Sequence, residues 1–232
     1  MQSTTALYKQ ILSDPYHTAE IRLNINGVGY YSDQIVSLST SNSMFSQSKA
    51  SVGGAVAGEI NCTIYPTSGA SIPKMATLIP YVRLTDGTNY SEWLQKGVFY
   101  IDTRKIDPET GLITIHGFDG MLKADQYYLT TSNQNTFPRS MSNVLAEICT
   151  RMGVTQDSRN SITDYTMVKP DRDKTMRDVL GYIASANGGN WVMNDIGQLR
   201  LIKLGDIPAE SFLLVDEYGN PISFGGVRII VG

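Results

Sequence analysis

The sequence predicts an α+β protein whose first half is a compact β barrel or sandwich and whose second half adds two helices and a hairpin. Short runs of alternating apolar residues, separated by turn residues, fill roughly the first 120 positions. After Pro138 the apolar spacing changes to the i, i+3, i+4 pattern of amphipathic helices. A chain of 232 residues is long enough for one large domain or two small ones.

The first predicted elements are a short helix and a β-hairpin. Residues 4–12 have helical apolar spacing, and Pro15 ends that helix. Residues 21–25 alternate as a strand, and Asn26-Gly27 is typical of a tight hairpin turn. We expect residues 30–38 to form the return strand of this hairpin.

A loop rich in serine, asparagine and glycine follows at residues 39–54. It contains an isolated apolar pair, Met44 and Phe45, which we interpret as the exposed tip of a long mobile loop. Exposed apolar side chains of this kind indicate contact with a partner. We therefore expect Met44 and Phe45 to lie at an interface.

Four further strands complete the first half. Residues 60–64 alternate, and residues 76–84 contain Pro80. Because a central strand rarely tolerates proline, Pro80 predicts an edge strand or a bulge. The strongest hairpin signal joins residues 97–103 to residues 112–118 through a charged turn.

The second half begins with two amphipathic helices. The first covers residues 141–152, with Ser140 as its expected N-cap and Gly153 as its C-cap. The second covers residues 176–184, with Asp173 as its expected N-cap. Two consecutive helices after a set of strands place the second half in the α+β class.

A hairpin and an apolar tail follow the helices. Residues 191–193 and 199–202 flank a turn. Strand character returns at residues 212–215, and the chain ends in an apolar run that includes Val227 and Ile229. A final strand without a polar closing segment is typical of an edge that awaits a partner strand. We therefore expect Val227 and Ile229 at an interface.

Composition argues against several classes of protein. The formal net charge is −3 and charged residues make up 18% of the chain, which does not favour strong binding to nucleic-acid phosphates. No apolar run approaches the roughly 18 residues that span a membrane. Cys62 and Cys149 lie far apart without a CxxC pair, so they indicate buried free thiols, and a disulfide would require the two segments to meet.

Side chains with catalytic chemistry are few. His17 and His116 belong to no metal-binding or nucleophilic motif, and we expect a solvated His17 and a structural His116. Asp102, Glu109 and Asp119 flank the strongest hairpin, and a glycosidase requires only two carboxylates across a cleft. Exposed turns and strand ends explain these three carboxylates better. We therefore predict a protein that is not an enzyme.

Two further patterns imitate ligand sites. A strand follows the glycine-rich run 53–58, whereas a dinucleotide site requires a helix there. Asp171 and Asp173 lack the further oxygen ligands of a calcium loop, and helix capping explains them better. We therefore expect neither cofactor nor metal.

Surface aromatic residues are better candidates for a functional surface. Tyr30, Tyr31, Tyr81, Tyr90 and Trp93 occupy strand and turn positions where aromatic side chains can remain exposed. Aromatic residues are enriched in protein interfaces. We expect Tyr81, Tyr90 and Trp93 to contribute to an interface, with a sugar-binding shelf as the alternative.

One stretch resembles a known family. Residues 177–184 form part of a helix, a glycine pair follows, and residues 195–201 combine an Asp-x-Gly turn with a basic strand. This order resembles the baseplate hub, or tail-associated, proteins of phage and prophage tails. Residues 97–102 and 115–122 resemble the paired strands that close the first tube-like barrel of that family. The similarity extends over residues 59–204 and includes no catalytic signature.

The resemblance implies three regions. Residues 1–122 correspond to a first tube-like β-barrel domain, residues 123–205 to a small α+β domain with two helices, and residues 206–232 to the beginning of a second barrel. Members of the family generally continue further, which implies a truncated hub or an N-terminal fragment.

The resemblance also implies a function. Hub protomers of the family assemble as homotrimers and adapt the symmetry of the tail tube to a trimeric tip. The chain would then be a structural protein of the virion, produced in the cytoplasm of a host bacterium. Its partners would be distal tail or tube proteins and the tape measure protein, with no membrane contact. DNA would pass through the ring without specific binding.

The sequence leaves two other functions open. A carbohydrate-binding or peptidoglycan-degrading module would use the surface aromatics and the carboxylates Asp102, Glu109 and Asp119. A secreted or surface adhesion domain is the third interpretation, against which the missing signal peptide argues.

Overall fold

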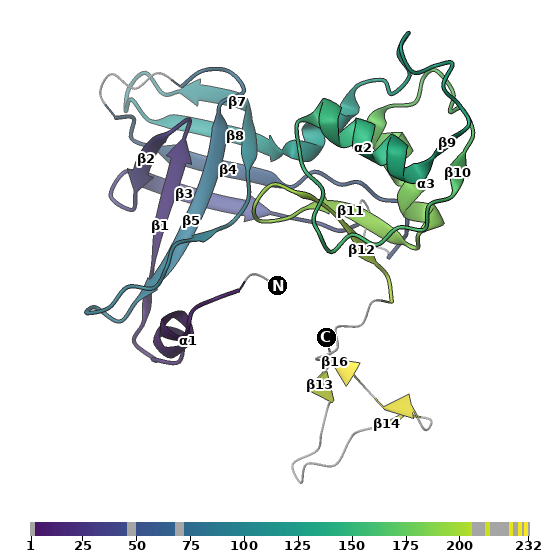
Figure 1. The fold of residues 1–232 in the computed structure, drawn as a ribbon. Helices are drawn as coiled ribbons and strands as arrows, with labels where there is room; N and C mark the ends of the chain where they lie inside the picture. The colour runs from purple at the N-terminus through teal and green to yellow at the C-terminus, as the bar shows by residue number, and fades with distance from the viewer. Residues whose placement is uncertain are drawn as a thin grey trace.

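The computed structural model describes residues 3–45, 50–67 and 72–205, together with the backbone of four short strands between residues 212 and 231. A large antiparallel sheet forms a first unit, and helices with a hairpin form a second, smaller unit beside it (Figure 1). The expected α+β class is therefore confirmed.

The first unit consists of one short helix and an eight-stranded sheet with the order β2-β1-β5-β7-β8-β4-β3, in which β6 also pairs with β5. Its elements are α1 (Ala6–Leu12), β1 (Thr18–Ile25), β2 (Val28–Tyr31), β3 (Ile35–Ser41), β4 (Glu59–Ile64), β5 (Thr77–Thr85), β6 (Leu94–Gln95), β7 (Phe99–Ile106) and β8 (Ile113–Asp119).

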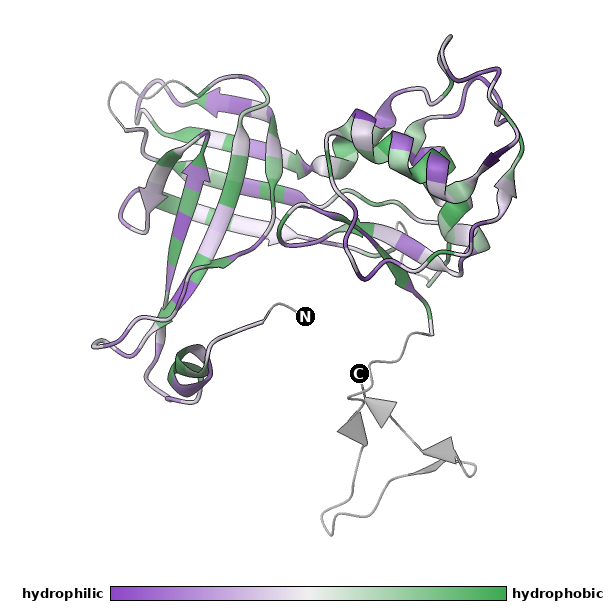
Figure 2. Cartoon of the chain, viewed as in Figure 1, coloured by the Kyte–Doolittle hydropathy of each residue, from purple (hydrophilic) through white to green (hydrophobic). Residues whose placement is uncertain are grey.

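The sheet curls around one apolar core. Its two outermost strands, β2 and β3, are consecutive in the sequence, and Tyr30 of β2 and Ile35 of β3 belong to the same buried cluster. Inward residues alternate with outward ones: in β8, Ile113 and Ile115 face the core, and Thr114 between them faces outward. Figure 2 shows this alternation as apolar and polar bands along the strands. The result is a barrel-like unit without a ladder between β2 and β3 among the described residues.

The first predicted hairpin is correct only in its first two strands. β1 and β2 pair through the Asn26-Gly27 turn, where both residues have positive φ as a tight hairpin turn requires. The chain then turns again, and β3 pairs with β4 at the other end of the sheet order. Residues 30–38 are therefore two strands, not one, because a second turn separates Tyr31 from Ile35.

The prediction that Pro80 marks an edge strand or a bulge is wrong. β5 lies inside the sheet between β1 and β7, and its pairing with β1 continues through Pro80 without a register shift. The carbonyl of Pro80 accepts a hydrogen bond from the Lys96 amide, on the side of β5 that faces away from β1. Since N–H and C=O of one strand residue point to the same side, the missing N–H of Pro80 also faces away from β1. There β5 changes partner from β7 to β6, so Pro80 removes no bond of the β1 ladder.

The second unit packs two helices against a hairpin. Its elements are the 3-10 helix η1 (Gly120–Asp125), β9 (Arg139–Ser140), α2 (Met141–Met152), β10 (Thr166–Met167), α3 (Met176–Ala186), β11 (Gly189–Met193) and β12 (Leu199–Lys203). The inner faces of α2 and α3 share a core with Trp191, which is fully buried and donates a hydrogen bond through Nε1 to the Leu180 carbonyl.

Capping residues fix the ends of both helices. Ser140 caps α2 and Gly153 ends it in the left-handed conformation, as the sequence predicts. The predicted N-cap of α3, Asp173, is wrong, because Thr175 occupies that position and forms a reciprocal capping box with Asp178. Asp173 instead forms an ion pair of 3.6 Å with the neighbouring Lys174.

Part of the predicted mobile loop is a well-packed connection between the two units. Gly53 donates its amide to the Gly189 carbonyl, and Ala55 forms a parallel bridge with Trp191. Gly53 has φ +88°, and a Cβ there would lie 2.1 Å from Ser185 Oγ, so only glycine fits this crossing of α3. Residues 53–55 therefore extend the hairpin of the second unit by one short strand-like segment.

The exposed tip expected at Met44 and Phe45 is absent, because both residues are half-buried. β3 ends at Ser41, and the Ser43 hydroxyl bonds the backbone of Phe45 and holds a local turn. An interface role for Met44 and Phe45 stays a prediction.

Four short strands lie beyond residue 205: β13 (Phe212–Leu213), β14 (Ser223–Phe224), β15 (Val227–Arg228) and β16 (Ile230–Val231). β13 pairs with β16 and β14 pairs with β15, both antiparallel. Val227 belongs to β15, whereas Ile229 lies outside the described residues. The interface expected at Val227 and Ile229 stays a prediction.

Candidate interaction surface

The outer face of the first unit carries a stack of three aromatic rings and two arginines. The guanidinium of Arg22 lies over the rings of Tyr81 and Trp93, with its Cζ 4.4 and 4.9 Å from their centroids. The guanidinium of Arg83 lies over Trp93 and Tyr90, at 4.5 and 4.2 Å. Trp93 is thus shared between the two arginines, and we call these five residues the arginine–aromatic cluster.

Strand register brings the cluster together. β1 and β5 pair so that Arg22 is opposite Tyr81 and Glu20 is opposite Arg83. The pairing of β6 with β5 places the segment before Leu94, including Trp93, beside this face. An isolated bridge between Thr85 and Tyr90 brings the turn after β5 back onto the sheet.

The two arginines of the cluster differ in their electrostatic partners. Arg83 forms an ion pair with Glu20, in which Nε and Nη2 both contact Oε2 at 2.8 and 2.6 Å. Arg22 makes no hydrogen bond or ion pair with residues 3–45, 50–67 and 72–205, and its Nε is enclosed without a hydrogen-bond partner. Within the part of the chain that the structure describes, only one of the two stacked cations is therefore neutralised.

The predicted aromatic residues divide between core and surface. Tyr81, Tyr90 and Trp93 come together as expected for one surface, and Tyr90 is 48% exposed. Tyr31 lies opposite Arg22 on β2 and is 51% exposed. Tyr30 is fully buried, so its expected exposure is wrong: it belongs to the inward face of β2.

Sequence reasoning missed Arg22 and Arg83. The available signal was the polar set Glu20, Arg22 and Asn24, which alternates with the apolar residues of β1 and therefore faces outward. Only the pairing of β1 with β5, whose residues are far apart in the sequence, shows that this polar set meets the aromatic residues.

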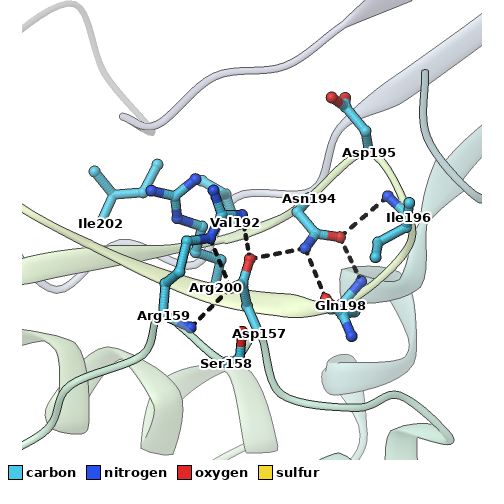
Figure 3. A pocket seen from close by; sticks show the side chains of 10 residues that line it. All are labelled: Asp157, Ser158, Arg159, Val192, Asn194, Asp195, Ile196, Gln198, Arg200 and Ile202. Carbon is cyan, nitrogen blue, oxygen red and sulfur yellow. Dashed lines mark hydrogen bonds and ion pairs between the residues drawn. The ribbon is translucent and has the colours of Figure 1, made fainter. Parts of the chain in front are cut away.

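A second surface feature is a hollow of about 410 Å³ on the outer face of the β11–β12 hairpin. Its polar wall is held by Asp157, which accepts hydrogen bonds from Arg159 at 2.8 and 2.5 Å and from Asn194 at 2.8 Å (Figure 3). These hydrogen bonds, led by those from Arg159, hold the pKa of Asp157 well below its usual range. Arg200 and Ile202 line the same hollow.

The hollow is rigid and close to charge balance. Asn194 Oδ1 also accepts the amides of Ile196 and Gln198, which fixes the hairpin turn. Asp157 and Arg159 neutralise each other, and Asp195 and Arg200 contribute one charge of each sign. Such a surface has the chemistry of a packing contact and no nucleophile–base pair.

The three carboxylates considered for catalysis do not come together. Asp119 is buried on the inward face of β8, whereas Asp102 is exposed and lies 3.7 Å from His116 on the outward face. Glu109 lies in the exposed turn at the other end of the β7–β8 hairpin, roughly 20 Å from Asp119 at the usual rise of a strand. Glycosidase carboxylates lie within about 10 Å of each other.

Asp119 has a structural position at the junction of the two units. Its carboxylate accepts the amides of Gly58 at 2.7 Å and Met121 at 2.9 Å, so it caps η1 and holds the start of β4. Burial raises the pKa of Asp119 to about 6, although these two hydrogen bonds and the nearby Arg177 act in the opposite direction.

The histidines and cysteines also have structural surroundings. His116 lies between Glu59 and Asp102. Its ring is edge-on to the Phe118 ring, with 4.7 Å between the two ring centroids. The partly buried His17, expected to be solvated, contacts the carbonyl of Asp14 through Nδ1.

Cys62 and Cys149 are free and buried, as predicted, and belong to separate cores. Burial raises the pKa of Cys62 to about 12 and that of Cys149 to about 11, which makes both thiols poor nucleophiles.

Two further features concern the described residues, 3–45, 50–67 and 72–205: metal-binding groups and membrane-spanning helices. Within these ranges, no group of three or more histidine, cysteine or acidic residues is placed to hold a metal ion. No helix in this part of the chain has the length and apolar character needed to cross a membrane. Asp171, one residue of the rejected calcium pattern, lies in a turn in which its carbonyl accepts the Lys174 amide.

Comparison with solved structures identifies tail proteins with a similar fold. The 43 kDa tail protein of prophage MuSo2 from Shewanella oneidensis matches with a TM-score of 0.57 at 15% sequence identity, covering 84% of this chain and 59% of that protein. A tail protein from Neisseria meningitidis matches with a TM-score of 0.50 at 12% identity, covering 88% of this chain and 53% of that protein.

The chain therefore spans less than two thirds of the length of either tail protein. No protein-family model matches the sequence, and no curated protein matches it. Because the matches cover more than four fifths of the chain, they include both units rather than the sheet alone. The chain thus shares the two-unit fold of these two tail proteins.

Proposed function

We propose that the chain is a structural component of a phage or prophage tail. The observation that carries this proposal is the fold shared across both units with a prophage tail protein at only 15% identity. A fold kept while most side chains differ fits a role that depends on shape and assembly.

Within the tail, we propose a hub at the tip or baseplate that joins the tail tube to a trimeric tip. Three copies of the chain would form the hub, and distal tail or tube proteins and the tape measure protein would be its neighbours. Residues 206–232 would begin a second barrel that continues in a longer chain. DNA would pass through the ring without specific binding, which agrees with the net charge of −3.

The arginine–aromatic cluster supports a role in protein contacts. Tyrosine, tryptophan and arginine are the residues most enriched among those that dominate binding energy in interfaces. The cluster places two arginines, two tyrosines and one tryptophan on one outward sheet face. The dispersed positions of Asp102, Glu109 and Asp119 give the carbohydrate-acting alternative no comparable support.

The mass in solution tests the hub proposal. We would measure it by gel filtration with light scattering for this chain and for a version extended past Gly232 by the residues that follow it in its natural context. We expect a trimer from at least the extended chain, because the second barrel would then be complete.

The outcomes of this measurement separate the possibilities. A trimer from both chains would place the main trimer contacts within residues 1–232, and a trimer from the extended chain alone would place them in the second barrel. Two monomers at high protein concentration would contradict the hub.

A further inference from the structure

Arg22 is the least balanced charged group of the arginine–aromatic cluster. Its guanidinium carbon lies over two aromatic rings, those of Tyr81 and Trp93. Its Nε is enclosed and has no hydrogen-bond partner. A cation partly removed from water without an anionic partner is costly, and stacking on aromatic faces replaces only part of the lost hydration.

Arg83 provides an internal comparison in the same stack. It also lies over two rings, Trp93 and Tyr90, but its edge is taken by the carboxylate of Glu20. Arg83 therefore shows that a guanidinium stacked on this face binds a carboxylate that is within reach. Arg22 has no hydrogen-bond or ion-pair partner among the described residues, and because its Nε is enclosed, a carboxylate would have to bind its Nη groups rather than the Nε side used in Arg83.

We propose that Arg22 is the docking point for a carboxylate, from an aspartate or glutamate side chain, on a different protein of the assembly. Two rings lie against the guanidinium, which favours a partner that approaches in the guanidinium plane. Since Nε is enclosed, the two Nη groups form the edge that such a partner meets. A planar carboxylate binds such an edge through two parallel hydrogen bonds. Tyr31 of β2 is opposite Arg22 in the strand pairing and is 51% exposed, so an aromatic side chain beside the site is available to the same partner.

A protein carboxylate fits this site better than a phosphate backbone. Phosphate recognition along a nucleic acid requires several cations in a row. Among the described residues, by contrast, Arg22 is the one cation of the cluster without an ion pair, and Glu20 contributes a negative charge beside it. This inference rests on the proposed role in a protein assembly and adds the chemistry of the partner.

The test uses the whole chain and a pair of matched peptides. One is the capped tripeptide acetyl-Ser-Glu-Ser-amide, and the other carries glutamine in place of glutamate. Side-chain signals of arginine Nε–H and of the Trp93 indole are followed by two-dimensional NMR during titration. We expect the glutamate peptide to shift the signals of Arg22 and Trp93 in a saturable way, and the glutamine peptide to leave them in place.

Variants assign the binding to the guanidinium edge. Arg22→Lys keeps a cation in the stack but cannot form two parallel hydrogen bonds, and we expect it to bind the glutamate peptide about tenfold more weakly. Arg22→Gln should abolish the saturable shift of Trp93. Arg104→Gln, which removes an exposed arginine of β7 outside the cluster, is the matched control and should bind as the parent does.

Several results would overturn the inference. Equal shifts with both peptides would remove the role of the carboxylate, and unchanged binding by Arg22→Gln, with its fold confirmed by the remaining spectrum, would remove the role of Arg22. Inorganic phosphate shifting the same signals at lower concentration would assign the site to phosphate. If raising the protein concentration without any peptide shifted the signals of Arg22 and Trp93, the site would be assigned to a second copy of the chain. None of these results depends on the trimer mass, so failure here and failure of the hub remain distinguishable.

Discussion

At the scale of single residues, the buried carboxylate of Asp119 couples stability to pH. Burial raises its pKa in the folded protein to about 6, whereas an aspartate in an unfolded chain titrates near 4. Between these values the folded state keeps a proton that the unfolded state has released. The contribution of Asp119 to stability is therefore fully present below about pH 4 and is lost as the pH rises through about 6.

This coupling can be measured with Asp119→Asn, which cannot ionise. We expect the unfolding free energy of the parent chain to fall by up to about 3 kcal/mol more than that of the variant between pH 4 and pH 7.5. Urea denaturation at the two pH values gives both differences. Parallel pH profiles for parent and variant would show that Asp119 ionises in the folded protein as it does in the unfolded chain.

The cluster illustrates what single-residue reasoning can predict of a site. Tyr81, Tyr90 and Trp93 are recognisable as interface candidates because large amphipathic rings in strands and turns often remain at the surface. Their arginine partners are not recognisable, because Arg22 reaches Tyr81 only through a strand pairing that no local pattern determines. Met44 and Phe45 show the converse error. The polar residues around them predict an exposed loop, whereas both side chains are half-buried.

At the scale of elements, Arg177 of α3 joins three segments. Its guanidinium binds both carboxylate oxygens of Asp125 in η1 and donates to the carbonyls of Met121 and Ala55. Lysine carries the same charge but cannot reach all of these acceptors in a fixed plane. Arg177 therefore connects α3 to η1 and to the segment that precedes β4.

We expect Arg177→Lys to lower the unfolding free energy by about 1–3 kcal/mol, because it leaves partly buried carbonyls without donors. Urea denaturation followed by circular dichroism measures the loss. Arg172→Lys is the control, since Arg172 is exposed just before α3 and should change stability little. Equal stability of the two variants would argue against a clamp at Arg177.

Elements differ in how far local sequence determines them. α2 agrees with its prediction at both ends, because Ser140 and Gly153 are each the best capping residue available nearby. The N-cap of α3 lies two residues after the predicted one, because Asp173 and Thr175 are both good caps and only Thr175 has an acidic partner three residues later. Pro80 gives a wrong expectation because its missing N–H faces the side of β5 on which the partner strand changes from β7 to β6. That arrangement depends on the neighbouring strands and not on the local sequence.

At the scale of the whole molecule, the two units share contacts that make independent unfolding unfavourable. The Asn190 side chain binds the Gly54 amide and the Ser51 carbonyl, so a segment of the first unit completes the second. Gln95 Nε2 donates to the Asp195 carbonyl at 2.9 Å and adds a second connection. We therefore expect one cooperative transition for residues 3–205.

The two tryptophans report on the two units separately. Trp93 lies in the first unit and Trp191 in the core of the second. We expect Trp191→Phe to destabilise the second unit and to lower the urea midpoint seen by Trp93 fluorescence by the same amount as the midpoint seen by circular dichroism. Trp93→Phe is the reciprocal variant. A Trp93 midpoint unchanged by Trp191→Phe would show that the units unfold independently.

The contact between Gly54 and Asn190 joins positions 136 residues apart in the sequence. Contacts of such long separation form late, because the loop between them must first close. During synthesis, every strand of the first sheet leaves the ribosome well before β11 exists, so residues 51–57 have no surface to bind. A nascent chain that stops short of Trp191 would therefore present an unfinished edge to its neighbours.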